Sequence, residues 1–166
     1  MMNLSAITLK MVDFYKGNRE DIRHFIKVHA FARTIGMAER LDKRTQDTLE
    51  VAAIVHDIAC PICREKYGDT NGDHQEAESE ALLCPFLEEF NLPKEMEERV
   101  IFIVTHHHTY VNVEGRDWQI LLEADYLVNA DESEKYMKGF DGFREKVFKT
   151  ATGKRLLASM YPEKMK

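Results

Sequence analysis

Four residues in this 166-residue sequence place polar, metal-ligating groups where apolar side chains would be expected. His56 and Asp57 follow directly on an apolar helical run, and Asp125 interrupts a second one. His24 lies on the face of a third amphipathic segment. An ionised aspartate among apolar side chains is costly unless it is paired or binds a cation. These positions are therefore the first candidates for chemistry.

Two imidazoles and two carboxylates form a mixed nitrogen and oxygen ligand set that suits a divalent transition metal. His24 and His56 are 32 residues apart, which is about one helix, a turn and a second helix back to the same level. We therefore expect the four side chains to converge inside a helical bundle, with coordination positions left for water or substrate.

The elements that must position them are helices almost throughout, because apolar residues recur with helical spacing and no segment alternates with period two. We predict an all-α, single-domain bundle of about seven helices over residues 1–166, with a metal-binding core at about 20–130 and a helical appendage at about 133–166. Residues 59–73 are predicted to form a long loop. The predicted helices cover 5–16, 18–40, a segment capped by Asp42 or Thr45 that ends near Ile58, 74–90, 94–107, 118–130, and segments around 134–138 and 141–160.

In order and spacing, residues 24–28, 52–58 and 123–127 resemble the H…HD…D signature of the HD superfamily of metal-dependent phosphohydrolases. The resemblance covers roughly residues 20–130 and agrees with the all-α prediction. It implies metal ligands at His24, His56, Asp57 and Asp125. It also implies hydrolysis of a small phosphomonoester, phosphoanhydride or nucleotide by a metal-activated water.

The resemblance also suggests catalytic roles. Asp57, as a ligand beside the water, is the first candidate to orient that water or take its proton. Lys27 stands where relatives commonly have arginine and is the first candidate for a phosphate contact, ahead of Arg64 and Lys66 in the predicted loop.

Members of the family that bind a second metal carry two further histidines. The matching positions here are His74, after the predicted loop, and His107, at the end of the following helix, with Asp57 as the bridging carboxylate. His106 and His108 flank His107, so its assignment stays open. We expect one or two divalent ions, of Mn, Fe, Co, Ni or Zn, with Mg as a further option.

Two positions depart from the family pattern. Ala59 replaces the glycine that commonly follows the His-Asp pair, and Cys60 stands where nucleotidase-like relatives have a catalytic glutamate. The general base is therefore unassigned. Two alternatives stay open: a metal- or nucleotide-binding module without turnover, and a di-iron oxygenase of the HD type.

Composition limits the partners. The sequence has 23 basic and 29 acidic residues and a net charge of −6, which argues against duplex nucleic acid and against a polybasic membrane surface. From Ser133 onward the sequence has nine basic and four acidic residues, and we expect this stretch to form a solvated helix face. A contact of Arg144, Lys149 or Arg155 with phosphate, or with a second copy in a homodimer, is the alternative. A bound metal would still attract a small phosphorylated molecule, because it reverses the local field.

The sequence contains no apolar run long enough to span a membrane and no recognisable signal peptide. Its three cysteines, Cys60, Cys63 and Cys84, are too few for a disulfide framework. We expect a cytoplasmic protein in which the Cys60–Cys63 pair is incidental, since no second cysteine pair is present to complete a zinc knuckle.

Overall fold

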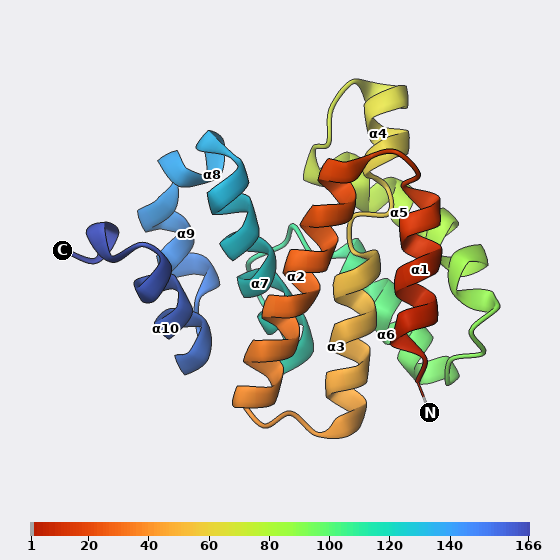
Figure 1. Cartoon of the computed structure of the whole chain (residues 1–166), viewed down its shortest axis with the longest axis horizontal. Coiled ribbons are helices and arrows are strands. Elements are labelled where there is room, and N and C mark those ends of the chain that lie inside the picture. The colour runs from red at the N-terminus through yellow and green to blue at the C-terminus, as the bar shows by residue number, and fades with distance from the viewer. Residues whose placement is uncertain (1) are drawn as a thin grey trace.

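The computed structural model describes residues 2–166, and within this range the secondary structure is helical, with no β-strand (Figure 1). This confirms the predicted all-α class. The helices are α1 (Leu4–Phe14), α2 (Arg19–Ala38), α3 (Lys43–Val55), α4 (Cys60–Tyr67), α5 (Gly72–Glu88), α6 (Lys94–Thr105), α7 (Arg116–Glu132), α8 (Glu134–Lys138), α9 (Phe140–Val147), α10 (Ala151–Met160) and the 3-10 helix η1 (Pro162–Met165).

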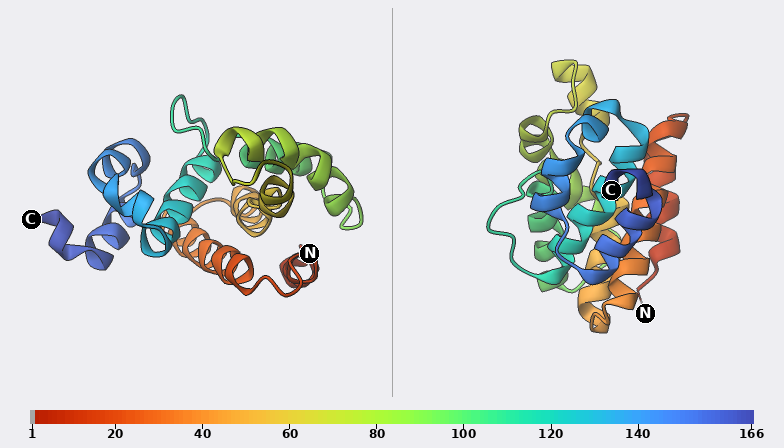
Figure 2. Two further views of the ribbon diagram at one scale, coloured as in Figure 1. Left: turned by 90° about the horizontal axis from the view of Figure 1, so that it is seen from above. Right: turned by 90° about the vertical axis from the view of Figure 1, so that its left-hand side faces the viewer.

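Helix α3 is the centre of the bundle. It contacts α1, α2, α6 and α7, and every residue from Leu49 to Val55 is buried. Viewed from above, α3 lies between α1 and α2 on one side and the α5–α6 pair on the other (Figure 2). Helix α7 is almost as deeply enclosed, because its buried residues cover all sides of the helix. Polar side chains that end or interrupt these two helices must therefore face the interior.

Local signals in the sequence set the start of the helices that carry the site. The Asn18 side chain accepts a hydrogen bond from the amide of Asp21 at the start of α2, and Asp42 does the same for Thr45 in α3. Gly17 adopts a φ of +84°, which ends the preceding turn in a left-handed conformation that favours glycine.

Two segments differ from the sequence prediction. The predicted loop 59–73 contains α4, whose start carries Pro61 and whose end is capped by Gly68 in the left-handed region. The predicted segment 141–160 is divided into α9 and α10, because the backbone is extended at Phe148 and Thr150. The chain consequently has more and shorter helices than expected.

The helices that follow α7 gather at one end of the long axis of the molecule (Figure 1). Of these, α8 and α9 contact α7, whereas α10 contacts both α7 and α2. The fully buried carboxylate of Glu123 fixes this arrangement, because it accepts hydrogen bonds from the amides of Lys149 and Thr150 and from the Thr150 hydroxyl, at 2.6–2.9 Å. None of the described helices is long and apolar enough to cross a lipid bilayer.

Candidate metal centre

Four of the side chains singled out from the sequence meet at one point in the bundle. His24 comes from α2, and His56 and Asp57 from the turn that ends α3. His24 Nε2 lies 3.1 Å from Asp57 Oδ2, 3.2 Å from Asp125 Oδ1, on α7, and 3.3 Å from His56 Nε2. His56 Nε2 lies 3.3 Å from the same oxygen of each aspartate.

These separations match those between neighbouring ligands of one ion. Bonds of about 2.1 Å place two donors about 3.0 Å apart at a right angle and about 3.4 Å apart at the tetrahedral angle. The observed distances of 3.1–3.3 Å fall within this interval. The site is also enclosed, because His56 is fully buried and the side chains of His24 and Asp125 are 10% and 7% exposed.

The outer nitrogens of the histidines are occupied, which turns their Nε2 lone pairs inward. His56 Nδ1 donates to the carbonyl of Ala53 at 2.8 Å, since a carbonyl can only accept. His24 Nδ1 contacts Glu132 Oε1 at 3.3 Å. Carbonyl and carboxylate partners of this kind fix the tautomer and orientation of metal-ligating imidazoles. Two lone pairs and two carboxylates therefore converge, an arrangement that a cation completes.

A second group of donors lies on the other side of Asp57. Its Oδ1 is 3.4 Å from His107 Nε2, and Asp57, His107 and His108 have donor atoms within 4.8 Å of one another. The Nδ1 of His107 donates to the carbonyl of Val104 at 2.7 Å. The Nε2 atoms of His107 and His108 are buried and have no hydrogen-bond partner among the described residues. Unpaired buried imidazole nitrogens beside a carboxylate fit a second cation.

The other histidines of this region point elsewhere. His74 stacks on Tyr67, with ring centroids 3.9 Å apart, and its Nδ1 contacts Asp69 at 2.7 Å. It belongs to neither donor group. His106 stacks on Phe102. The structure therefore brings His107 to the predicted position together with its neighbour His108, whereas it does not bring His74 there.

The carboxylates of Asp57 and Asp125 stabilise positive charge on the neighbouring histidines. Burial alone would lower the pKa of His24, but contacts with Asp125 and Asp57 raise it well above its usual value. For His56 the same two carboxylates outweigh burial and raise the pKa to about 10. His108, by contrast, is buried beside His107, and its pKa falls to about 3, so its imidazole is neutral and able to ligate. Without an ion, protons supply the positive charge that the carboxylates require.

The donors open into a cleft of about 270 Å³ between α2, α4, α5, α7 and α8. Arg64 lines this cleft and makes a two-pronged ion pair with Asp21, at 2.6 and 2.9 Å. Lys27, the phosphate contact predicted from the sequence, is not among the lining residues, and its Nζ is paired with Glu132 at 2.9 Å. Among the described residues that line the cleft, the cation is therefore Arg64 rather than Lys27.

Two positioning residues were missed from the sequence. Glu132 contacts the outer nitrogen of His24 from the last turn of α7. The buried Tyr15 donates from its hydroxyl to the carbonyl oxygen of Asp57 at 2.6 Å and so fixes the turn after α3. No local sequence pattern predicts either contact, because Glu132 lies 108 residues from His24 and Tyr15 lies 42 residues from Asp57.

Cys60 is poorly suited to act as a base. Cys60 lines the cleft, but burial raises the pKa of its thiol far above the usual value, with the charge of Asp57 acting in the same direction. Cys60 therefore does not replace the glutamate of nucleotidase-like proteins as a base. Cys60 and Cys63 are both buried free thiols in α4, and Cys84 is exposed.

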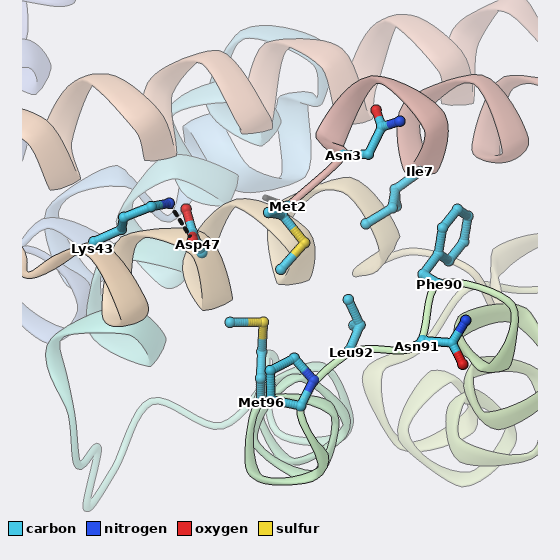
Figure 3. A pocket seen from close by; sticks show the side chains of 10 residues that line it. Met2, Asn3, Ile7, Lys43, Asp47, Phe90, Asn91, Leu92 and Met96 are labelled. Carbon is cyan, nitrogen blue, oxygen red and sulfur yellow. Dashed lines mark hydrogen bonds and ion pairs between the residues drawn. The ribbon is translucent and has the colours of Figure 1, made fainter.

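A separate cavity of about 380 Å³ lies between α1, α3 and the connection from α5 to α6 (Figure 3). Apolar side chains surround it, among them Met2, Ile7, Phe90 and Met96, and the Asp47–Lys43 ion pair stands at one edge. It contains none of the candidate metal ligands.

The comparisons agree with this arrangement. The family model described as HD domain matches residues 21–137. A crystal structure of a predicted HD superfamily hydrolase from an uncultured Thermotogales bacterium superposes with a TM-score of 0.72 at 19% identity, over 97% of this chain and 86% of that one. None of the curated proteins compared matches the chain. The structural likeness establishes the shared fold.

Proposed function

Because the chain belongs to the HD domain family of metal-dependent hydrolases, we propose that it hydrolyses a small phosphomonoester, phosphoanhydride or nucleotide. The observation that carries this proposal is the convergence of three inward-facing Nε2 atoms, those of His24, His56 and His107, on two aspartates at the floor of a cleft, the buried Asp125 and the partly exposed Asp57.

We assign His24, His56, Asp57 and Asp125 to one divalent ion, and Asp57, His107 and His108 to a second. The separations within the first group and the unpaired Nε2 atoms of the second support this division. Imidazole and carboxylate together suit Mn, Fe, Co, Ni or Zn better than Mg, which prefers oxygen ligands. When bound, such an ion lowers the pKa of a coordinated water and withdraws charge from the phosphoryl group.

The side chains of the chain have distinct roles in this reaction. Asp57, whose two oxygens face the two donor groups, orients the attacking water. Arg64 contacts the phosphoryl oxygens from the cleft wall, because a guanidinium can pair with two of them at once. Glu132 holds the ring of His24 in place. Burial of the donors excludes bulk water from the reacting centre.

The test is phosphate release. Purified protein is loaded separately with Mn, Fe, Co, Ni, Zn and Mg and assayed against a panel of phosphate esters, anhydrides and nucleotides. We expect release with at least one transition metal, and a loss of at least 100-fold in kcat for Asp57→Asn. Asp47→Asn makes the same chemical change in the remote cavity of Figure 3 and should leave the rate within two-fold.

If no ion supports phosphate release from any substrate of the panel, the proposed hydrolase activity is wrong. Dioxygen consumption by the iron-loaded protein, with no phosphate release, would instead favour the oxygenase, because two donor groups that share Asp57 also suit a di-iron pair. Retention of metal without any turnover would favour a binding module.

A further inference from the structure

The cleft above the metal donors continues into a second, larger hollow of about 520 Å³. Four residues line both spaces: Thr70, His108, Ser133 and Tyr136. His108 belongs to the second donor group, so the two spaces meet beside the metal centre. A molecule with its phosphate at the donors must extend past His108 and Tyr136 to enter the larger space.

Aromatic rings form one wall of this second space, which we name the aromatic lobe after Tyr110, Tyr136 and Phe143. Phe143 is the centre of the wall: its ring lies 5.3 Å from that of Tyr136 at 33° and 5.9 Å from that of Tyr110 at 84°. Behind it, Tyr126 stacks on Phe143 at 4.9 Å and holds the ring in place. Tyr110, Tyr136 and Phe143 are all partly exposed residues, which leaves this wall open to a ligand.

The remaining lining is polar and nearly balanced in charge. Asn71 and Thr70 offer hydrogen bonds, while Lys135 and Asp73 place one charge of each sign at the lobe. A second phosphate would meet only one cation here, in contrast to a planar uncharged group, which would find aromatic rings and hydrogen-bonding partners. Flat rings, including every nucleobase, stack favourably on aromatic side chains.

We infer that the aromatic lobe binds the leaving group of the substrate and that this leaving group carries a planar ring, stacked against Phe143 and Tyr136. The inference rests on the proposed phosphohydrolase function and specifies its substrate class. It gives the C-terminal helices a role in specificity, because Tyr136 and Phe143 come from α8 and α9, beyond the residues that supply the metal ligands.

Matched esters test this without a change in leaving-group chemistry. Adenosine 5′-monophosphate and ribose 5-phosphate release the same kind of primary alcohol and differ by the base. Benzyl phosphate and ethyl phosphate form a second pair with a simple ring. We expect the ring-bearing member of at least one pair to have a kcat/KM at least ten-fold higher. That ratio should fall about ten-fold in Phe143→Leu, which keeps an apolar side chain but removes the ring.

Phe90→Leu is the matched control, since it removes a ring from the separate cavity of Figure 3 and should keep the wild-type ratio. A preference for benzyl phosphate alone would show a lobe for simple rings, and a preference for the nucleotide alone a lobe for nucleosides; both support the inference. If the wild-type protein has nearly equal kcat/KM values for the two members of both pairs, the inference of a ring-binding lobe is wrong, whereas the proposed hydrolase activity still stands.

If no ester is cleaved with any metal, the proposed function fails, and calorimetry on the Mn-loaded protein decides the inference separately. Adenosine 5′-monophosphate should bind at least ten-fold more tightly than ribose 5-phosphate, and equal affinity would contradict a ring-binding lobe.

Discussion

Asp57 and His107 stand 50 residues apart in the chain, yet Asp57 Oδ1 and His107 Nε2 are separated by only 3.4 Å. The other oxygen of Asp57 faces His24 and His56. The Asp57 carboxylate therefore contacts His24 and His56 through one oxygen and His107 through the other. A carboxylate that bridges two ions is expected to be placed in this way.

The first prediction concerns metal stoichiometry. Removing either imidazole of the second group, by His107→Ala or His108→Ala, should reduce the bound Mn or Fe from two ions per chain to one, because the first group is left intact. Elemental analysis of protein loaded and desalted in parallel measures this. His74→Ala is the control and should retain two ions, since His74 contacts Asp69 and Tyr67 instead. Loss of an ion in His74→Ala, with full occupancy in His108→Ala, would reverse the assignment.

The second prediction concerns the partner of His24. Glu132→Gln weakens the contact that orients this imidazole, and loss of such outer contacts typically lowers metal affinity about 10- to 100-fold. Chelator competition gives the affinity directly. Lys27→Met removes the other partner of Glu132 without touching the histidine and should change the affinity less than three-fold. Equal losses in both variants would show that general charge, rather than ring orientation, matters.

The third prediction concerns the docking of α10. A Cβ atom at Gly153 would overlap Oε2 of Glu123, whose buried carboxylate is held by several hydrogen bonds. Gly153→Ala should therefore lower the free energy of unfolding by about 2–4 kcal/mol, measured by urea denaturation. Gly142→Ala, where a Cβ meets nothing within 4 Å, should be neutral or stabilise α9 by up to about 1 kcal/mol. Similar effects of the two substitutions would argue against this packing.

The fourth prediction concerns acid stability through Glu50, whose side chain is 1% exposed between α2 and α3. Burial raises its pKa, but hydrogen bonds from His29, Gln46 and Arg33 outweigh burial and lower it to about 2. Because the folded-state pKa lies below the unfolded value near 4.5, this stabilisation is complete above about pH 4.5. It is lost as the pH falls toward 2, and after allowance for solvent near Arg33 it amounts to roughly 1–3 kcal/mol.

Urea unfolding of the chelator-treated wild type and of Glu50→Gln, from pH 7 to pH 3, tests this. The wild type should be more stable at pH 7, and the difference should narrow below pH 4.5. A difference that does not depend on pH would mean that Glu50 acts through packing alone.

The sequence was sufficient to identify polar residues that lie within apolar helices as candidates for the site. His56, Asp57 and Asp125 stand out because a polar group in an apolar helix requires a partner, and the structure brings them together with His24. Helix α4 has Pro61 in its first turn and Gly68 at its end. The same two residues, with Asn71-Gly72 and scattered charges, also favour a loop, which is the sequence-based prediction for this segment. The contacts of Tyr15 and Glu132 depend on distant partners and have no local signature.

The choice among neighbouring histidines could not be made from spacing. His106, His107 and His108 follow one another where α6 ends, so a shift of one residue turns each ring in another direction. The backbone leaves helical geometry at His106, with φ of −125°. The ring of His106 packs against Phe102 and Trp118 at this point, and the linear pattern does not reveal these contacts.

His24 and Asp125 are 101 residues apart in the chain, which has a consequence for folding during synthesis on the ribosome. At about 5–20 residues per second, roughly 3–14 s pass between the synthesis of Asp57 and that of Asp125. During this interval the nascent chain carries three of the four donors of the first ion without the helix that encloses them. Binding of the proposed ion by all four donors would therefore be a late event in biogenesis, and the earliest helices would assemble without help from the ion.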